Sequence, residues 1–137
     1  MYLLDTNVVS ELRKPKPHGA VLAWLKSVNE QALFLSAFSL AEIQRGIEIT
    51  RQQDVAKAQS LEHWLDQLAE SFEVLTLDAL ILREWARMMH RRSNTLSEDA
   101  MLAATAKVNG LQVVTRNTSD FEALGLVCLN PFNFNSV

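Results

Sequence analysis

The sequence has almost no cysteine and no long apolar run, and each absence excludes a class of protein. Cys128 is the only cysteine among 137 residues, so neither an intrachain disulfide nor a multi-cysteine zinc site can form within the chain. No apolar run approaches the roughly 18 residues that a membrane-spanning helix needs. The first residues also lack the basic and apolar regions of a signal peptide. We therefore expect a cytoplasmic protein with no membrane segment.

The chain also has little net charge, −3 at pH 7. The whole molecule therefore has no electrostatic reason to seek nucleic acid, and any such partner would need a local basic patch or bound cations. What is present is a hydrophobic content of 48% with 21% charged residues. This composition is typical of a chain that folds around a core, not of a disordered one. We expect a single domain over residues 1–137.

Short apolar runs alternate with amphipathic segments along the chain. Strands are predicted at 2–5, 33–36, 73–77, 111–115 and 126–129, and helices at 20–28, 39–53, 58–72, 78–92 and 99–110. The last of these helices ends at Asn109-Gly110, a pair that favours a helix C-cap. This alternation predicts an α/β fold, with a short parallel sheet of about four to five strands sandwiched between helices.

Four acidic residues stand beside predicted strand ends or helix starts: Asp5, Glu42, Asp99 and Asp120. In an open α/β sheet, ligands bind outside the carboxyl ends of the strands, so these acids could meet there. Two carboxylates about 5 Å apart at an effective dielectric of about 20 repel by roughly 3 kcal/mol, so a cluster requires a compensating cation. Oxygen ligands without cysteine, and histidines without ligand spacing, favour Mg²⁺ or Mn²⁺.

Taken singly, three of these acids also have a purely structural interpretation. Ser39 and Glu42 match the capping box S-x-x-E, in which the glutamate bonds back to its own helix start. Asp99 lies in a predicted first helical turn, where a carboxylate stabilises the helix dipole. Asn117 could cap a helix that has Asp120 in its first turn. Asp5 fits a turn less well, because it follows directly on an apolar strand.

Five segments taken together resemble the PIN-domain ribonucleases, and more narrowly the VapC and FitB-type toxins of type II toxin–antitoxin modules. The segments are LLDTNVVSEL, SLAEIQRGI, DAMLAATA, VVTRNTSDF and the closing NPF. The resemblance implies a PIN-like fold and an endoribonuclease that leaves 3′-hydroxyl and 5′-phosphate ends. It implies that Asp5 and Asp99 bind Mg²⁺, which Mn²⁺ could replace. Glu42 occupies the second acidic position of the family.

The fourth acidic position is open between two residues. Some FitB-like relatives have an aspartate directly after Thr-Arg, where this chain has Asn117, whereas Asp120 matches the aspartate before Phe121. Asn117 could still contribute its carbonyl or a bound water, but it carries no charge. This substitution leaves the binding of a second metal ion open.

Short polar side chains lie near the proposed ligands in sequence. We expect them to orient the ligands by hydrogen bonds, with ordinary turn or cap hydrogen bonds as the alternative; they are Thr6, Asn7, Ser39, Thr115 and Asn117. Positive charge for attracting RNA occurs beside the same motifs, and Arg116 is the residue within the fourth motif. Such basic clusters also occur as solvated surface.

The resemblance implies partners as well as a reaction. They are an RNA substrate and a small antitoxin that itself binds operator DNA, in a homodimer or a toxin–antitoxin hetero-oligomer. A catalytically silent PIN fold kept for partner binding is the main alternative, and Asn117 is the residue that favours it. An aspartyl-nucleophile phosphatase is disfavoured, because its second acid, two residues after the first, is here Asn7.

Overall fold

Five short strands form one parallel sheet at the centre of the computed structural model, which describes residues 1–135. The strand order is β3-β2-β1-β4-β5. Their bounds are β1 (Tyr2–Leu4), β2 (Leu33–Ser36), β3 (Glu73–Leu75), β4 (Gln112–Val114) and β5 (Cys128–Leu129). The predicted parallel α/β sheet is confirmed. The last two residues of the predicted domain 1–137 lie outside the described part.

Helices occupy most of the remaining chain. The α-helices are α1 (Thr6–Val9), α2 (Gly19–Ser27), α3 (Ala37–Arg51), α4 (Val55–Ser71), α5 (Ala79–Met89), α6 (Ser97–Asn109) and α7 (Thr118–Ala123). Short 3₁₀ turns are η1 (Ser10–Arg13), η2 (Glu30–Ala32), η3 (Asn94–Leu96) and η4 (Pro131–Asn133). Within residues 1–135 none of the helices combines the length and the apolar character that crossing a membrane requires.

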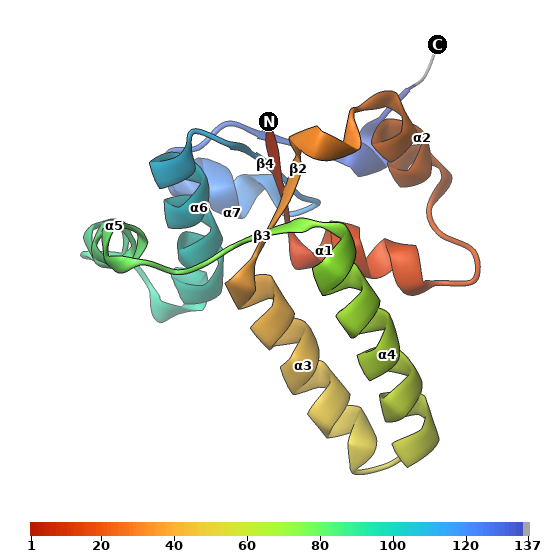
Figure 1. The fold of residues 1–137 in the computed structure, drawn as a ribbon. Helices are drawn as coiled ribbons and strands as arrows, with labels where there is room; N and C mark the ends of the chain where they lie inside the picture. Colours follow the sequence, from red (N-terminus) through yellow and green to blue (C-terminus); the bar gives the residue numbers. More distant parts are fainter. Residues whose placement is uncertain (136–137) are drawn as a thin grey trace.

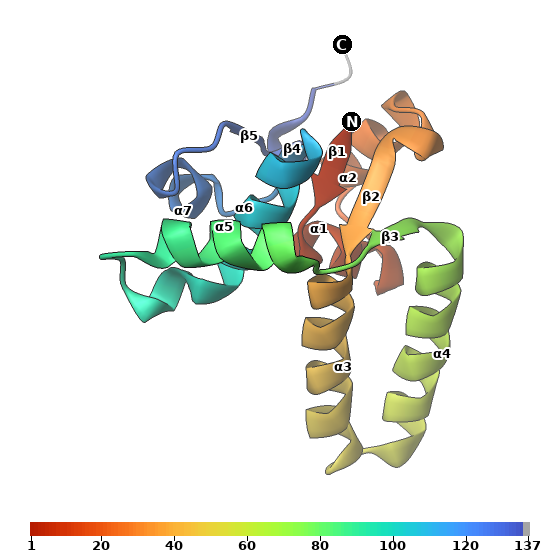
Figure 2. The ribbon, with the colours of Figure 1, turned by 60° about the vertical axis from the view of Figure 1, so that its left-hand side comes forward.

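The two faces of the sheet bury two separate hydrophobic cores. Leu4 and Val114 point into a core formed with α1 to α4, whereas their neighbours Leu3 and Val113 point into a core formed with α5 to α7. Successive residues of a strand face opposite sides, so strands covered on both faces have continuous apolar sequences. Figures 1 and 2 show these two groups of helices on either side of the strands.

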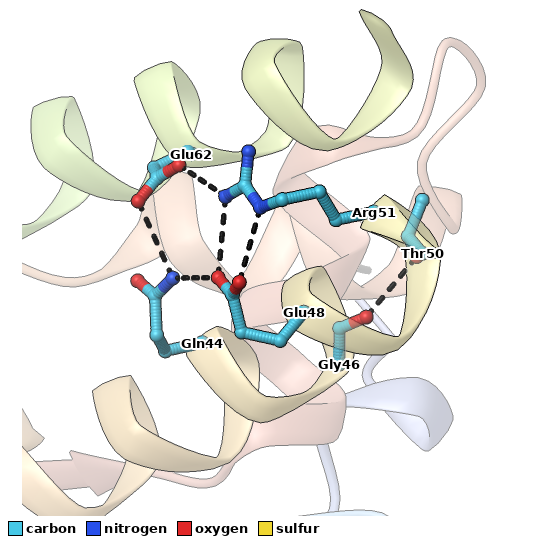
Figure 3. A network of polar contacts seen from close by, with 6 residues as sticks. All are labelled: Gln44, Gly46, Glu48, Thr50, Arg51 and Glu62. Carbon is cyan, nitrogen blue, oxygen red and sulfur yellow. Dashed lines mark hydrogen bonds and ion pairs between the residues drawn. The ribbon is translucent and has the colours of Figure 1, made fainter. Parts of the chain in front are cut away.

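Helices α3 and α4 form an antiparallel hairpin that extends beyond the sheet (Figure 2). Polar contacts join the two helices near its far end: Arg51 of α3 pairs with Glu48 of its own helix and Glu62 of α4, and Gln44 bonds to both glutamates (Figure 3). Exposed ion pairs of this kind add little stability, about 1 kcal/mol or less each.

Several boundaries differ from the sequence prediction for local reasons. Helix α3 begins at Ala37 instead of Ser39, because the side chain of Ser36 caps it by accepting a hydrogen bond from the Phe38 amide at 3.0 Å. Helix α5 ends at Met89, three residues early, and is followed by Arg91 in a left-handed conformation. The predicted end of α6 is confirmed, with Gly110 in the left-handed region at φ 66°.

Candidate active site

Four chain segments that carry the predicted acids meet at the carboxyl edge of the sheet. Asp5 follows β1, α3 follows β2 directly, and the 115–120 segment follows β4, while the first turn of α6 lies at the same edge (Figures 1 and 2). The chain reverses its direction of winding between β1 and β4. Such a switch point is where open α/β sheets bind their ligands.

Asp5 is the most buried of the acids, with 5% of its surface exposed. One carboxylate oxygen accepts from the Thr6 amide at 2.7 Å, which makes Asp5 the N-cap of α1. The other accepts from the Thr115 hydroxyl at 2.7 Å and the Asn7 amide at 3.3 Å. Burial raises the pKa of Asp5, and the hydrogen bonds from Thr115 and Thr6 only partly oppose it. Asp5 is thus a cap and also a carboxylate in need of positive charge.

Glu42 projects from α3 toward the segment that follows β1. Its carboxylate accepts a hydrogen bond from the Thr6 hydroxyl at 3.0 Å. Burial, followed by a hydrogen bond with Glu98, raises the pKa of Glu42 to about 7, and the negative charges of Glu98 and Asp5 contribute further. The sequence interpretation as a capping box is wrong, because Ser36 caps α3 and the buried hydroxyl of Ser39 has no hydrogen-bond partner within residues 1–135.

Glu98 is a member of this cluster that the sequence analysis missed. It bonds to Glu42 and forms an ion pair with Arg45 of α3 at 3.1 Å, so it joins α6 to α3 across the site. The hydrogen bond from Glu42, followed by the Arg45 pair, lowers the pKa of Glu98. Its signal in the sequence was its place directly before Asp99, since both acids lie in the first turn of α6.

Asp99 lies in the first turn of α6, as predicted. Burial, the charges of Asp5 and Asp120, and a hydrogen bond with Asp120 raise its pKa to about 6. A carboxylate that only stabilised a helix dipole would be favoured in its ionised form. The surroundings of Asp99 instead disfavour its ionised form, since they raise its pKa. The contact with Asp120 brings an aspartate of the fourth motif next to Asp99.

The neighbouring polar side chains have unequal contacts. Asn7 and Thr115 both bond to Asp5, and the Asn7 side chain makes two further hydrogen bonds. It donates to the Thr115 hydroxyl at 3.4 Å and accepts from the Arg116 backbone amide at 3.2 Å. The backbone amide of Asn117 donates to the same hydroxyl at 3.0 Å. The side chain of Asn117 is exposed and does not cap α7, although the residue stands at the N-cap.

This donor set is chemically suited to a hard divalent cation. Burial raises the pKa of three of these carboxyls, Asp5, Glu42 and Asp99, and no cation of residues 1–135 offsets it, whereas Arg45 pairs with Glu98. Ser39 also provides a buried hydroxyl that has no hydrogen-bond partner among residues 1–135, a kind of atom that ordered water commonly satisfies. Within residues 1–135 no group of three or more acidic, histidine or cysteine side chains is arranged so that it could hold a metal ion by itself. Mg²⁺ is commonly bound by one or two carboxylates, with water and phosphate completing its shell.

The fold and the acidic edge define a class of protein that comparison with known families identifies. The PIN domain model matches residues 2–125. The chain therefore belongs to the PIN-domain family, and the resemblance to its VapC and FitB-type members is confirmed.

Individual relatives match over nearly the whole chain. The chain is 36% identical over 139 residues to the VapC ribonuclease Y4jK of Sinorhizobium fredii, covering 96% of this chain and 98% of that protein. It is 32% identical over 143 residues to the toxin FitB of Neisseria gonorrhoeae, covering 97% and 99%. Among solved structures, FitAcB from Neisseria gonorrhoeae superposes with a TM-score of 0.84 at 31% identity, covering 98% of this chain and 100% of that chain.

Proposed function

We propose that this protein is a metal-dependent endoribonuclease toxin of a type II toxin–antitoxin module, acting in the cytoplasm. The observation that carries the proposal is the convergence of Asp5, Glu42 and Asp99, from three separate segments, with the pKa of each carboxyl raised. A fold that gathers carboxylates without neutralising them loses stability, which a bound cation would restore. The names of the VapC ribonuclease and the FitB toxin support the reaction and the biological role.

The roles of the acids follow from their surroundings. Asp5 and Asp99 would bind Mg²⁺, with Mn²⁺ able to substitute, because Asp5 follows β1 at the switch point of the sheet and its charge acts on Asp99. A bound Mg²⁺ supplies positive charge for the RNA phosphate and makes a coordinated water more acidic. Glu42, held by Thr6 and with a pKa of about 7, is placed to accept a proton from an attacking water. Asp120 adds negative charge beside Asp99.

The polar neighbours of Asp5 keep the site in shape. The hydroxyl of Thr115 and the amide of Asn7 donate to the same oxygen of Asp5, so that the other lone pairs of the carboxylate keep a fixed direction. A carboxylate oriented in this way binds a cation without losing side-chain entropy at that moment. Thr6 does the same for Glu42.

We further propose that a cognate antitoxin inhibits this protein and binds operator DNA in the complex, with the toxin as a homodimer or in a hetero-oligomer. The solved relative FitAB, bound to IR36 DNA fragment, superposes with a TM-score of 0.83 at 31% identity and covers 98% of each chain. That identity, over the full length, is the support for the same type of assembly here.

The proposal is tested by RNA cleavage with the purified chain in EDTA, Mg²⁺ or Mn²⁺. We expect cleavage only with the metal ions, products that carry 5′-phosphates, and a kcat at least about a hundredfold lower in Asp99→Asn. Asp66→Asn, at an exposed acid on α4, is the matched control and should cleave like the wild type. Equal cleavage in EDTA would contradict metal dependence, and no cleavage in any buffer would favour the silent partner-binding module.

A further inference from the structure

The closing NPF motif has no role in the proposed reaction, yet the structure places it beside the acidic site. The guanidinium carbon of Arg116 lies 3.7 Å from the centre of the Phe132 ring, a close cation–π contact. The motif sets the position of this ring: the Asn130 side chain accepts from the Phe132 amide at 3.0 Å, and Pro131 starts the turn η4. The Phe132 ring is therefore held in a fixed position against the Arg116 guanidinium.

A second segment packs against the same ring from the side. The His18 ring meets Phe132 edge to face, with centroids 5.1 Å apart and planes at 65°. The backbone amide of His18 donates to the buried carboxylate of Glu11 at 3.0 Å, and Lys14 pairs with that carboxylate. Two remote parts of the chain, at Arg116 and His18, thus contact the ring that the NPF turn positions.

Arg116 is joined to the acidic site through its backbone. Its amide donates to Asn7, whose side chain also bonds to Asp5, and the preceding residue Thr115 donates to Asp5. The Arg116 side chain is exposed, and its guanidinium makes no ion pair or hydrogen bond with the described residues 1–135. The nearby carboxylate of Glu11 is already occupied by Lys14 and His18. Arg116 is thus a positioned cation whose side-chain donors are not used by any residue in the described part of the chain.

We propose that Arg116, stacked on Phe132, is a platform on which the enzyme stacks an unpaired RNA base next to the phosphate that it cleaves. This inference rests on the proposed function, whose substrate site it extends. A guanidinium is planar, stacks on bases through its face and donates to phosphate through its edge. The Phe132 ring lies against one side of the Arg116 guanidinium, and the Arg116 side chain is exposed to solvent. An unpaired base of single-stranded RNA can stack on this exposed guanidinium, whereas the bases of a duplex are already stacked on one another. Phe132 and His18 are positioning residues that act through Arg116.

The first test is binding of a fluorescein-labelled single-stranded RNA of about 12 nucleotides, a length within the range of known single-strand sites. Fluorescence anisotropy is measured with Ca²⁺ in place of Mg²⁺ to slow cleavage. We expect Arg116→Ala to weaken binding about tenfold, as for the loss of one stacked base. Arg116→Lys keeps the charge without the plane and should restore less than half of the lost affinity. Arg83→Ala, at an exposed arginine of α5, is the control for lost charge and should bind like the wild type.

The second test separates positioning from folding at Phe132. Phe132→Leu keeps an apolar side chain and should weaken binding about threefold, whereas Phe132→Tyr should bind like the wild type, since its ring keeps the cation–π contact. In the Arg116→Ala background, Phe132→Leu should have no further effect. The same variants should raise KM for RNA cleavage and leave kcat unchanged.

Each remaining outcome overturns the inference in a recognisable way. A similar loss in Arg83→Ala, or full recovery in Arg116→Lys, would show a general charge effect. An equal loss from Arg116→Ala on an RNA with the bases removed would show a phosphate contact only. If the wild type binds with the expected variant pattern but never cleaves, the proposed function fails and the platform stands. If the wild type cleaves RNA and Arg116→Ala binds RNA as tightly as the wild type does, only the platform proposal fails. If the wild type does not bind RNA at all, both proposals fail.

Discussion

Replacing Asp99 with asparagine should stabilise the metal-free protein and remove much of its response to metal. Asp99 is half-buried beside Asp5 and Asp120, and its pKa rises from the ordinary 3.8 to about 6. Apart from the contact with Asp120, no described residue donates a hydrogen bond to it. Asparagine therefore removes a repelled charge without leaving a donor unpaired. Asp5 is a poorer choice for this test, because Thr6, Asn7 and Thr115 all donate to it.

The expected gain follows from the raised pKa. The difference between 3.8 and about 6 corresponds to roughly 3 kcal/mol at about 1.36 kcal/mol per pH unit, and partial exposure to water reduces it to about 1.5 kcal/mol. Loss of the helix-dipole interaction at the first turn of α6 costs about 0.5 kcal/mol. A net gain of about 1 kcal/mol at pH 8 should raise Tm by about 3 °C.

The assay is thermal unfolding of the wild type, Asp99→Asn and the control Asp66→Asn, in EDTA at pH 8 and pH 4 and with Mn²⁺ at pH 8. At pH 4 the wild-type carboxyl of the folded state is protonated, so the repulsion is absent and the gain from Asp99→Asn should fall to near zero. With Mn²⁺ at about a hundred times its Kd, binding adds roughly 2.7 kcal/mol to the wild type. Asp99→Asn should gain much less.

A lower Tm for Asp99→Asn at pH 8 in EDTA would refute the view that the cluster is repelled. A gain of the same size at pH 4 and pH 8 would show an effect unrelated to charge. An equal Mn²⁺ response in both proteins would remove Asp99 from the metal site while leaving the repulsion argument intact.

Two further predictions concern the same cluster. Because Glu42 and Asp99 have pKa values of about 7 and about 6 in the folded state, ionising them disfavours folding. The free energy of unfolding in EDTA should therefore fall between pH 5 and pH 7 in denaturant titrations, and Mg²⁺ should reverse the fall; a rise over that range would contradict the assignment. Thr115→Val removes the buried 2.7 Å hydrogen bond to Asp5 and should cost about 1.5 to 3 kcal/mol in urea unfolding. An unchanged midpoint would show that Thr115 does not support Asp5.

Much of the fold is encoded in local pattern. Runs such as 33–36 are apolar on both faces because helices cover both sides of a parallel sheet, and the start and end of this strand agree with the structure. The left-handed Gly110 ends α6 where Asn109-Gly110 predicted it. The predicted start of α3 was wrong because two serines, Ser36 and Ser39, can each cap a helix, and in the structure Ser36 is the N-cap.

Four members of the acidic cluster, Asp5, Glu42, Asp99 and Asp120, were likewise visible in the sequence, whereas Glu98 was missed, and the metal-binding role of the cluster remains a prediction. The side chains that each acid contacts were decided by the tertiary structure. Glu98 reaches Glu42 and Arg45 from another helix, and Asp120 rather than Asn117 meets Asp99. The contact of Arg116 with Phe132 joins residues that no periodicity relates. Sequence pattern reports the burial of each segment by itself, whereas the distances between remote side chains depend on the strand order and on how the helices pack over the sheet.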